Sequence, residues 1–148
     1  MHKGYTLVEL LLTIGVLGIL LSIGGLAFAG IRNSNSIDSV AAEIRGELMR
    51  AQTRSLNGNP AGVYFEPTRY VYFEGAAYGE GDPGNEEHAL SSQMSLAPIT
   101  FDSSTAQFDP LTGYLQVFTD SSRVVVQLGA SGPTRTISVN RWGVVDVQ

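Results

Sequence analysis

Side chains that could do chemistry are sparse and scattered in this sequence of 148 residues. It contains no cysteine, which excludes disulfides and thiolate metal sites, and only two histidines, His2 and His88. A nucleophile elbow, a phosphate-binding loop and a zinc-protease motif are all missing from the sequence. We therefore expect a protein that is not an enzyme and that uses no cofactor and no small-molecule substrate.

An acid-rich stretch at residues 75–95 is the main concentration of oxygen ligands. Ca²⁺ takes about six to eight such ligands, but the spacing of these acids does not match an EF-hand loop. Because the stretch is also rich in Gly and Ser, we interpret it as a long surface loop with solvated acids, and keep calcium binding as the alternative. The side chains concerned are Glu80, Asp82, Asn85, Glu86 and Glu87.

A long apolar segment near the N-terminus carries one acid, Glu9. Residues 10–31 hold no charge over 22 positions, and as a helix they span roughly 33 Å, enough to cross the hydrocarbon core of a bilayer. A carboxylate near the end of such a segment costs a few kcal/mol on insertion and normally has a specific role. This combination indicates assembly and not catalysis.

The stretch Gly4-Tyr5-Thr6-Leu7-Val8-Glu9 resembles the processing site of type IV pilins and pseudopilins. The resemblance implies that a prepilin peptidase cuts after Gly4 and N-methylates Tyr5, which stands where the family usually has phenylalanine. In a filament of packed helices, the Glu9 carboxylate could pair with the cationic amine of a neighbouring subunit's Tyr5, and this would favour the correct register.

The resemblance also implies partners and a location. The partners are the prepilin peptidase, other pilin or pseudopilin subunits and the assembly platform. The subunit would cross the cytoplasmic membrane once with its C-terminal domain outside the cytoplasm, and then enter a surface filament or a periplasmic pseudopilus.

Two alternatives concern the same segment. A secretory signal peptide could be cleaved within Ala27–Gly30, but the leader has Lys3 as its only Lys or Arg and the apolar run is too long. The adjacent Gly24 and Gly25 weaken helix propensity by about 1 kcal/mol each. They indicate either a stretch that loosens on assembly, as in pilins, or a packing surface of small residues.

The sequence divides into four expected parts, which are a leader (1–4), a transmembrane and assembly helix (5–31), an amphipathic helix (32–57) and a β-rich globular domain (58–148). Polar residues at 32–36 suit a cap or a kink. Gly58 suits a left-handed helix cap, and Pro60 bars continuation. A stripe at three- and four-residue spacing predicts a helix face packed on a sheet, and consists of Ile37, Val40, Ala41, Ile44, Leu48 and Ala51.

Six or seven short strands follow, separated by regular turn signals. They predict an α+β fold in which a long N-terminal helix packs on a C-terminal antiparallel β-sandwich or curved sheet, as in the pilin fold. The expected strands are 63–65, 70–73, 96–101, 114–119, 123–128, 135–139 and 144–147.

The C-terminal stretch from Ile137 to Val145 resembles FimT-type minor pilins and H-type pseudopilins of type II secretion, through the pattern I-x-V-N-x-x-G-x-V. In this branch, DNA binders use cations near the C-terminal hairpin, which here are Arg135 and Arg141, with Trp142 available for base stacking. The alternative is a purely structural role, in which both arginines are solvated and Trp142 covers a sheet edge. The net charge of −5 gives no general attraction to nucleic acid.

The sequence thus favours a prepilin-like subunit of a type IV pilus or a type II secretion pseudopilus, as a minor component. The alternative is a DNA-binding minor pilin at the tip of a competence pilus. A membrane-anchored sensor that never assembles is a third class, disfavoured by the processing motif.

Overall fold

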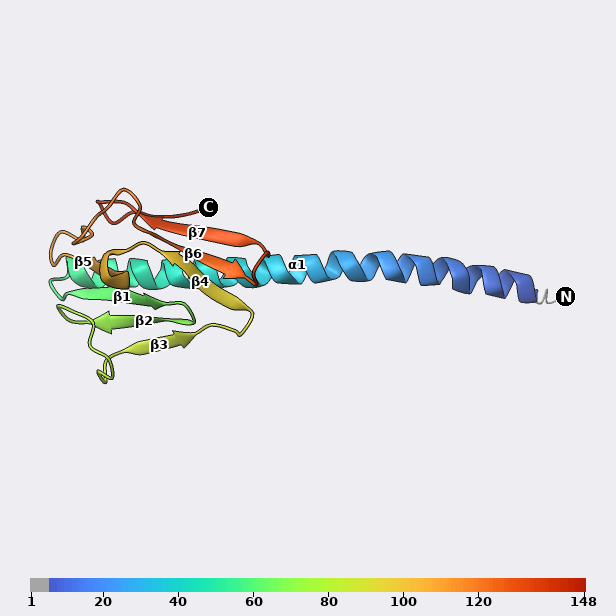
Figure 1. Cartoon of the computed structure of the whole chain (residues 1–148), viewed down its shortest axis with the longest axis horizontal. Coiled ribbons are helices and arrows are strands. Elements are labelled where there is room, and N and C mark those ends of the chain that lie inside the picture. Colours follow the sequence, from blue (N-terminus) through green and yellow to red (C-terminus); the bar gives the residue numbers. More distant parts are fainter. Residues whose placement is uncertain (1–5) are drawn as a thin grey trace. The chain divides into compact units, whose positions relative to one another are not determined.

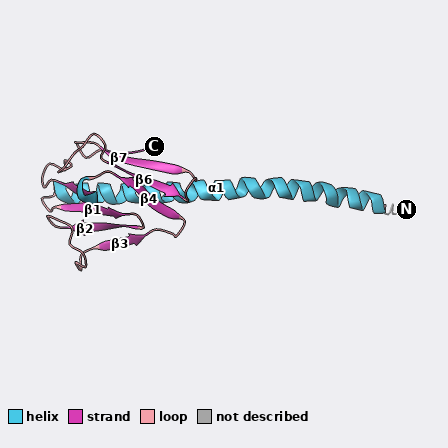
Figure 2. Cartoon of the chain, viewed as in Figure 1, coloured by secondary structure: helices cyan, strands magenta, loops and turns pink. Residues whose placement is uncertain are grey.

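The computed structural model describes residues 6–148, with the side chains of residues 22–35 left out. The described chain is α+β, with one long helix and eight strands (Figures 1 and 2). It forms two compact units, residues 1–35 and residues 36–148. The predicted cleavage at Gly4 and methylation of Tyr5 lie outside the described residues, as do the side-chain surroundings of Gly24 and Gly25.

Helix α1 runs from Leu7 to Leu56 and is continuous through residues 32–36, where the sequence suggested a cap or a kink. Its C-terminus is closed by Gly58, whose φ of 84° lies in the left-handed region. The N–H of Gly58 donates to Ser55 O at 2.8 Å, and the N–H of Asn59 donates to Arg54 O at 3.3 Å. These are the paired bonds of a Schellman motif, so the predicted cap at Gly58 is confirmed.

The strands form two four-stranded sheets in which all neighbouring strands are antiparallel. Sheet A has the order β3 (Glu86–Ala89), β2 (Arg69–Glu74), β1 (Ala61–Glu66) and β5 (Thr105–Phe108). Sheet B has the order β4 (Met94–Ile99), β6 (Arg123–Leu128), β7 (Thr134–Val139) and β8 (Val145–Val147). A short 3-10 turn, η1 (Asp102–Ser104), precedes β5.

One core joins both sheets to the second half of α1. The predicted apolar stripe is confirmed, because five of its side chains are buried in this core and Val40 packs against them partly buried. Each sheet contributes alternate residues, so one face of each sheet is apolar and covered. The buried stripe residues are Ile37, Ala41, Ile44, Leu48 and Ala51; sheet A adds Ala61, Val63, Phe65, Tyr70, Tyr72, Ala106 and Phe108; sheet B adds Leu96, Val124, Val126, Ile137, Val139 and Val145.

Three strand predictions need correction. Residues 114–119 form no strand, because only Leu115 is buried among them and only one isolated bridge, Phe108 to Leu115, joins them to a sheet. Strand β5 lies earlier, where buried Ala106 and Phe108 alternate with outward-facing residues. Strand β3 lies inside the predicted loop at 75–95 and is polar, since it is an edge strand held by pairing with β2.

Candidate functional site

The first turn of α1 places Glu9 close to the start of the helix. The backbone N–H of Glu9 donates to Thr6 Oγ1 at 3.3 Å, so Thr6 caps the helix from the residue before Leu7. Thr6 and Glu9 have the S/T-x-x-E spacing of a capping box, a signal that the sequence contains and that our prediction missed. The Glu9 side chain is exposed within the described part of the chain.

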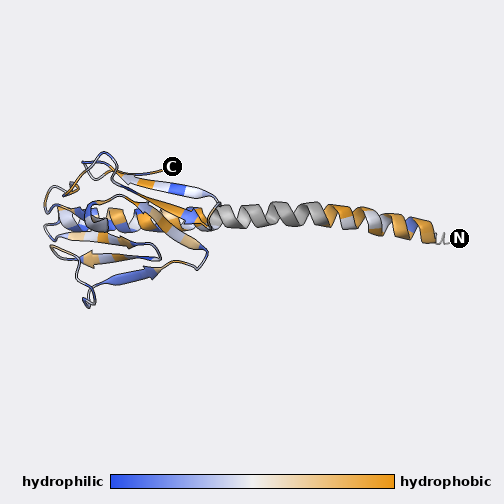
Figure 3. Ribbon diagram, in the orientation of Figure 1, coloured by the Kyte–Doolittle hydropathy of each residue, from blue (hydrophilic) through white to orange (hydrophobic). Residues whose placement is uncertain are grey.

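The helix beyond this turn presents apolar side chains on every side. All side chains from residue 6 to residue 21 are exposed, and Glu9 is the only charged residue in Leu7–Leu21. Figure 3 shows the N-terminal part of α1 mostly in the colour of hydrophobic residues. The Thr13 hydroxyl is satisfied within the helix, because it donates to Glu9 O at 2.6 Å and to Leu10 O at 3.0 Å. The large exposed apolar residues are Leu7, Val8, Leu10, Leu11, Leu12, Ile14, Val16, Leu17, Ile19, Leu20 and Leu21.

Within the described residues, no helix carries an apolar stretch long enough to cross a membrane.

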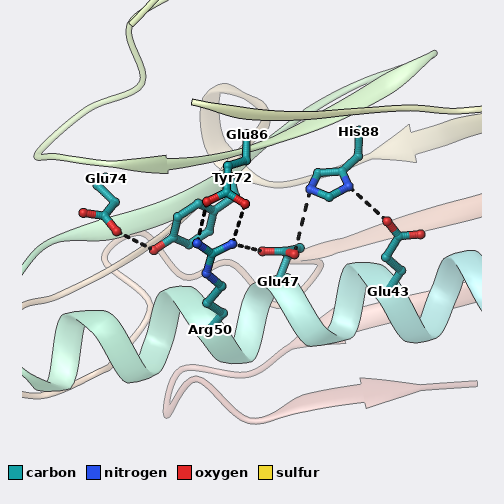
Figure 4. Close-up of polar contacts among 7 residues, drawn as sticks. All are labelled: Glu43, Glu47, Arg50, Tyr72, Glu74, Glu86 and His88. Carbon is teal, nitrogen blue, oxygen red and sulfur yellow. Dashed lines mark hydrogen bonds and ion pairs between the residues drawn. The ribbon is translucent and has the colours of Figure 1, made fainter. Parts of the chain in front are cut away.

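The second half of α1 is tied to sheet A by charged and aromatic side chains (Figure 4). Arg50 donates two hydrogen bonds to the Glu86 carboxylate of β3, one of them at 2.7 Å, and its guanidinium lies 4.0 Å from the centroid of the Tyr72 ring. This hydrogen bonding lowers the pKa of Glu86 and raises the pKa of Arg50. The Tyr72 hydroxyl in turn donates a hydrogen bond to the Glu74 carboxylate at 3.2 Å.

His88 of β3 makes a second set of contacts with α1, closer to the N-terminal end of the domain. Its ring stacks on Tyr70 at 4.9 Å with an interplanar angle of 1°. Nδ1 lies 3.0 Å from Glu43 Oε1, and Nε2 lies 3.8 Å from Glu47 Oε1 (Figure 4). The two carboxylates approach opposite nitrogens of the ring, so this arrangement fixes β3 on α1 and does not offer a shared metal position.

The acids proposed as calcium ligands are largely engaged by arginines. Arg69 bonds Glu66 at 2.7 Å and Glu87 at 2.9 Å, and lies 3.9 Å from Glu80. Hydrogen bonding from Arg69 lowers the pKa of Glu66. Among the described residues, no three or more of His, Cys, Asp and Glu are placed to hold a metal ion. Cross-strand pairing of β2 with β3 thus explains where Glu86 and Glu87 lie.

The C-terminal candidates for DNA contact separate into two places. Arg135 lies at the start of β7, where its Nε donates to Asp38 of α1 at 2.6 Å. Arg141 and Trp142 lie beyond the other end of β7, in the turn to β8. Trp142 is 58% exposed and meets the Tyr114 ring edge-on at 5.2 Å. Arg141 and Trp142 are therefore neighbours in one turn, whereas Arg135 lies in an ion pair with Asp38 at the other end of β7.

The turn that carries Arg141 and Trp142 is shaped by the asparagine and glycine of the C-terminal pattern. Asn140 Oδ1 accepts hydrogen bonds from the N–H groups of Trp142 and Val144, at 2.9 and 3.0 Å. Gly143 has a φ of 78°. Gln52 of α1 docks the turn by donating from Nε2 to Trp142 O at 3.3 Å, and also bonds Gly113 O at 3.0 Å. The I-x-V-N-x-x-G-x-V pattern thus describes a hairpin docked on the helix.

The comparisons with known proteins bear on the N-terminal end. A family model described as the prokaryotic N-terminal methylation motif matches residues 1–25. The match indicates a type IV pilin-like subunit that is processed as a prepilin by the prepilin peptidase and assembles with other pilin subunits. It suggests a structural subunit and not an enzyme. No curated protein and no solved structure matches this chain.

Proposed function

We propose that this chain is a pilin-type subunit that is cleaved after Gly4, N-methylated on Tyr5 and assembled through its apolar helix into a filament. The observation that carries the proposal is the exposed apolar surface of Leu7–Leu21, which lies within the matched methylation motif and has Glu9 as its only charge. Such a surface is unfavourable in water, so it needs a bilayer or the packed helices of neighbouring subunits.

In this proposal the parts of the chain act in sequence. The leader (1–4) is removed, the helix at 5–31 holds the subunit in the cytoplasmic membrane and then in the filament core, and the amphipathic helix (32–57) carries the β-rich domain (58–148). The assembly platform moves the subunit from one environment to the other.

In this proposal, Glu9 sets the register in which neighbouring subunits pack in the filament. Its carboxylate pairs with the methylated amine of a neighbouring subunit's Tyr5, in a filament core that has little other polar character. Removing one partner of a buried ion pair costs about 3–5 kcal/mol, because the other charge is left uncompensated. That cost is large enough to exclude an unpaired subunit from the filament.

The test compares Glu9→Leu with wild type in the native host. Loss of a charge from an apolar helix should leave the membrane level unharmed or raise it, and cleavage after Gly4 should continue, while incorporation into filaments should fail. Thr13→Val is the matched control, since it removes a polar group one turn further along without touching the charge. Normal filament incorporation of Glu9→Leu would refute the assembly role.

We also propose that the subunit is a minor component of a type IV pilus or a type II secretion pseudopilus. The support is the likeness of its C-terminal hairpin to FimT-type minor pilins and H-type pseudopilins. Quantitative mass spectrometry of purified filaments tests this, because a minor component should be present at a small fraction of the major subunit. An equal or larger amount would contradict it.

A second candidate function is DNA capture at the tip of a competence pilus. The exposed ring of Trp142, its contact with Tyr114 and the neighbouring Arg141 give a stacking surface beside a cation, as single-stranded DNA binders use. Binding should weaken with added salt and fall in Arg141→Ala and Trp142→Ala. Arg135→Ala should change it little, because Arg135 is held by Asp38. Equal losses in all three variants would contradict this site.

A further inference from the structure

A groove of about 400 Å³ lies on the outer face of sheet A, the face opposite the core. Tyr64, Thr105 and Gln107 alternate with the core residues of β1 and β5 and so project into it. Three loop segments complete its lining, namely residues 77–78, 102–103 and 116–117. The lining therefore comes from four stretches of the chain, at residue 64 and within 77–78, 102–107 and 116–117, which converge on one concave surface.

One side of the groove is a fixed aromatic pair. The rings of Tyr64 and Tyr78 stack at 4.1 Å with an interplanar angle of 10°. Tyr78 also meets the buried Phe73 edge-on at 5.8 Å. These contacts hold the loop after β2 on the sheet, so the stacked and half-buried pair forms one fixed side of the groove.

The remaining lining supplies uncharged hydrogen-bonding groups and one carboxylate. Gln107 Nε2 donates to Ala76 O at 2.6 Å and to Gly75 O at 3.3 Å, which orients the amide and leaves its Oε1 as an acceptor. Thr105 Oγ1 donates to a backbone carbonyl at 3.0 Å and keeps its lone pairs. Gln116 makes no side-chain hydrogen bond within the described residues, and its backbone N–H donates to Gln107 O at 2.9 Å.

This lining excludes several classes of ligand. No Lys or Arg is among the residues that line the groove, and Asp102 would repel phosphates, so nucleic acids and nucleotides do not fit. A single carboxylate is too few ligands for a cation such as Ca²⁺. The many amides and hydroxyls disfavour a purely apolar ligand, because their hydrogen bonds to water would be lost.

We propose that the groove binds a neutral saccharide unit. A sugar ring has one face of C–H groups, which packs on the part of the Tyr64–Tyr78 pair that the two rings leave uncovered, and a rim of hydroxyls that both donate and accept. Those hydroxyls meet the acceptors Gln107 Oε1 and Asp102 and the free amide of Gln116. The volume of the groove lies within the roughly 300–1,000 Å³ of small-molecule sites.

The experiment titrates the full-length chain with soluble cellohexaose, maltohexaose and chitohexaose in a phosphocholine detergent, whose headgroup contains no sugar. Binding is followed by saturation-transfer NMR and by calorimetry. At least one of the three should bind with a Kd of about 1 mM or lower. Tyr78→Ala should weaken that binding roughly tenfold through loss of the stacking ring, while Tyr78→Phe should retain it.

Gln116→Ala provides the second variant, because its side chain is exposed and its removal leaves the stacked tyrosines in place. It should weaken binding several-fold. Tyr114→Ala removes an exposed aromatic ring outside the groove and should leave the Kd unchanged. The proposal is overturned if none of the three oligosaccharides binds, if Gln116→Ala and Tyr78→Ala both bind as wild type does, or if Tyr114→Ala alone abolishes binding.

Discussion

Replacing Gly143 with alanine adds a single methyl group and tests how tightly the C-terminal hairpin packs on α1. Its φ of 78° strains any other L-residue by about 1–2 kcal/mol. An added Cβ would lie 2.5 Å from Gly113 O and still closer to Gln52 Nε2. Overpacking of this kind typically costs about 1–3 kcal/mol more. We therefore expect Gly143→Ala to destabilise the domain by about 2–5 kcal/mol.

Gly129→Ala is the matched control. Gly129 has a similar φ of 63°, but nothing lies within 4 Å of an added Cβ, so only the backbone strain of about 1–2 kcal/mol applies. At about 4 °C per kcal/mol for a domain of this size, Gly143→Ala should lower the Tm by roughly 8–20 °C and Gly129→Ala by roughly 4–8 °C.

Two signals follow the melts of the full-length chain, namely fluorescence of the sole tryptophan, Trp142, and far-ultraviolet circular dichroism. Equal losses in the two variants would show that the space around Gly143 is not tight. The contacts of the turn with Gln52 and Gly113 would then be wrong, and with them the placement of Arg141 and Trp142.

Three further predictions concern processing, the domain and its ion pairs. Co-expression with a prepilin peptidase should remove four residues and leave methylated Tyr5, by the motif at residues 1–25; mass spectrometry that finds an intact leader, or a cut after Ala29, would contradict the pilin assignment. A truncated chain of residues 36–148 should fold alone, because it forms a compact unit with its own core; circular dichroism should show mixed helix and strand with a cooperative melt, and a disordered spectrum would count against it. Finally, the hydrogen bonds from Arg50 lower the pKa of Glu86. The ion pair therefore stabilises the fold at pH values above the ordinary glutamate pKa, and this stabilisation is lost as the pH falls through the lowered pKa of Glu86. The fall in Tm between neutral and acidic pH should therefore be smaller in Arg50→Gln than in wild type, and an equal fall would mean that the pair contributes nothing measurable.

The sequence was most informative where side-chain type and spacing act locally. The stripe from Ile37 to Ala51 predicted the buried face of α1, and Gly58 predicted its end, since both signals depend on neighbouring residues alone. Strand β6 was predicted at Arg123–Leu128, as observed, because Val124, Val126 and Leu128 alternate along it and give it one apolar face.

The errors arise where tertiary contacts decide. Strand β3 is polar, and it is a strand because β2 pairs with it and because its Glu86 binds Arg50 of α1. The stretch after Gly113 has strand-like composition, but it meets sheet A only at its start, through the isolated bridge from Leu115 to Phe108 and the hydrogen bond from Gln116 N–H to Gln107 O. The groove beside Tyr64 was also beyond prediction, because its lining comes from four distant segments.

The position of Glu9 bears on how a change at this residue should be interpreted. Thr6 already satisfies the N–H of Glu9, so the start of α1 does not depend on the Glu9 carboxylate for its cap. Replacing that carboxylate forfeits a favourable interaction with the helix dipole, which is worth about 0.3–1 kcal/mol at an exposed N-terminus. This loss is far smaller than the cost of an unpaired charge in a filament core. A failure of Glu9→Leu to assemble would therefore report on the pairing with a neighbouring Tyr5 and not on a helix that no longer forms.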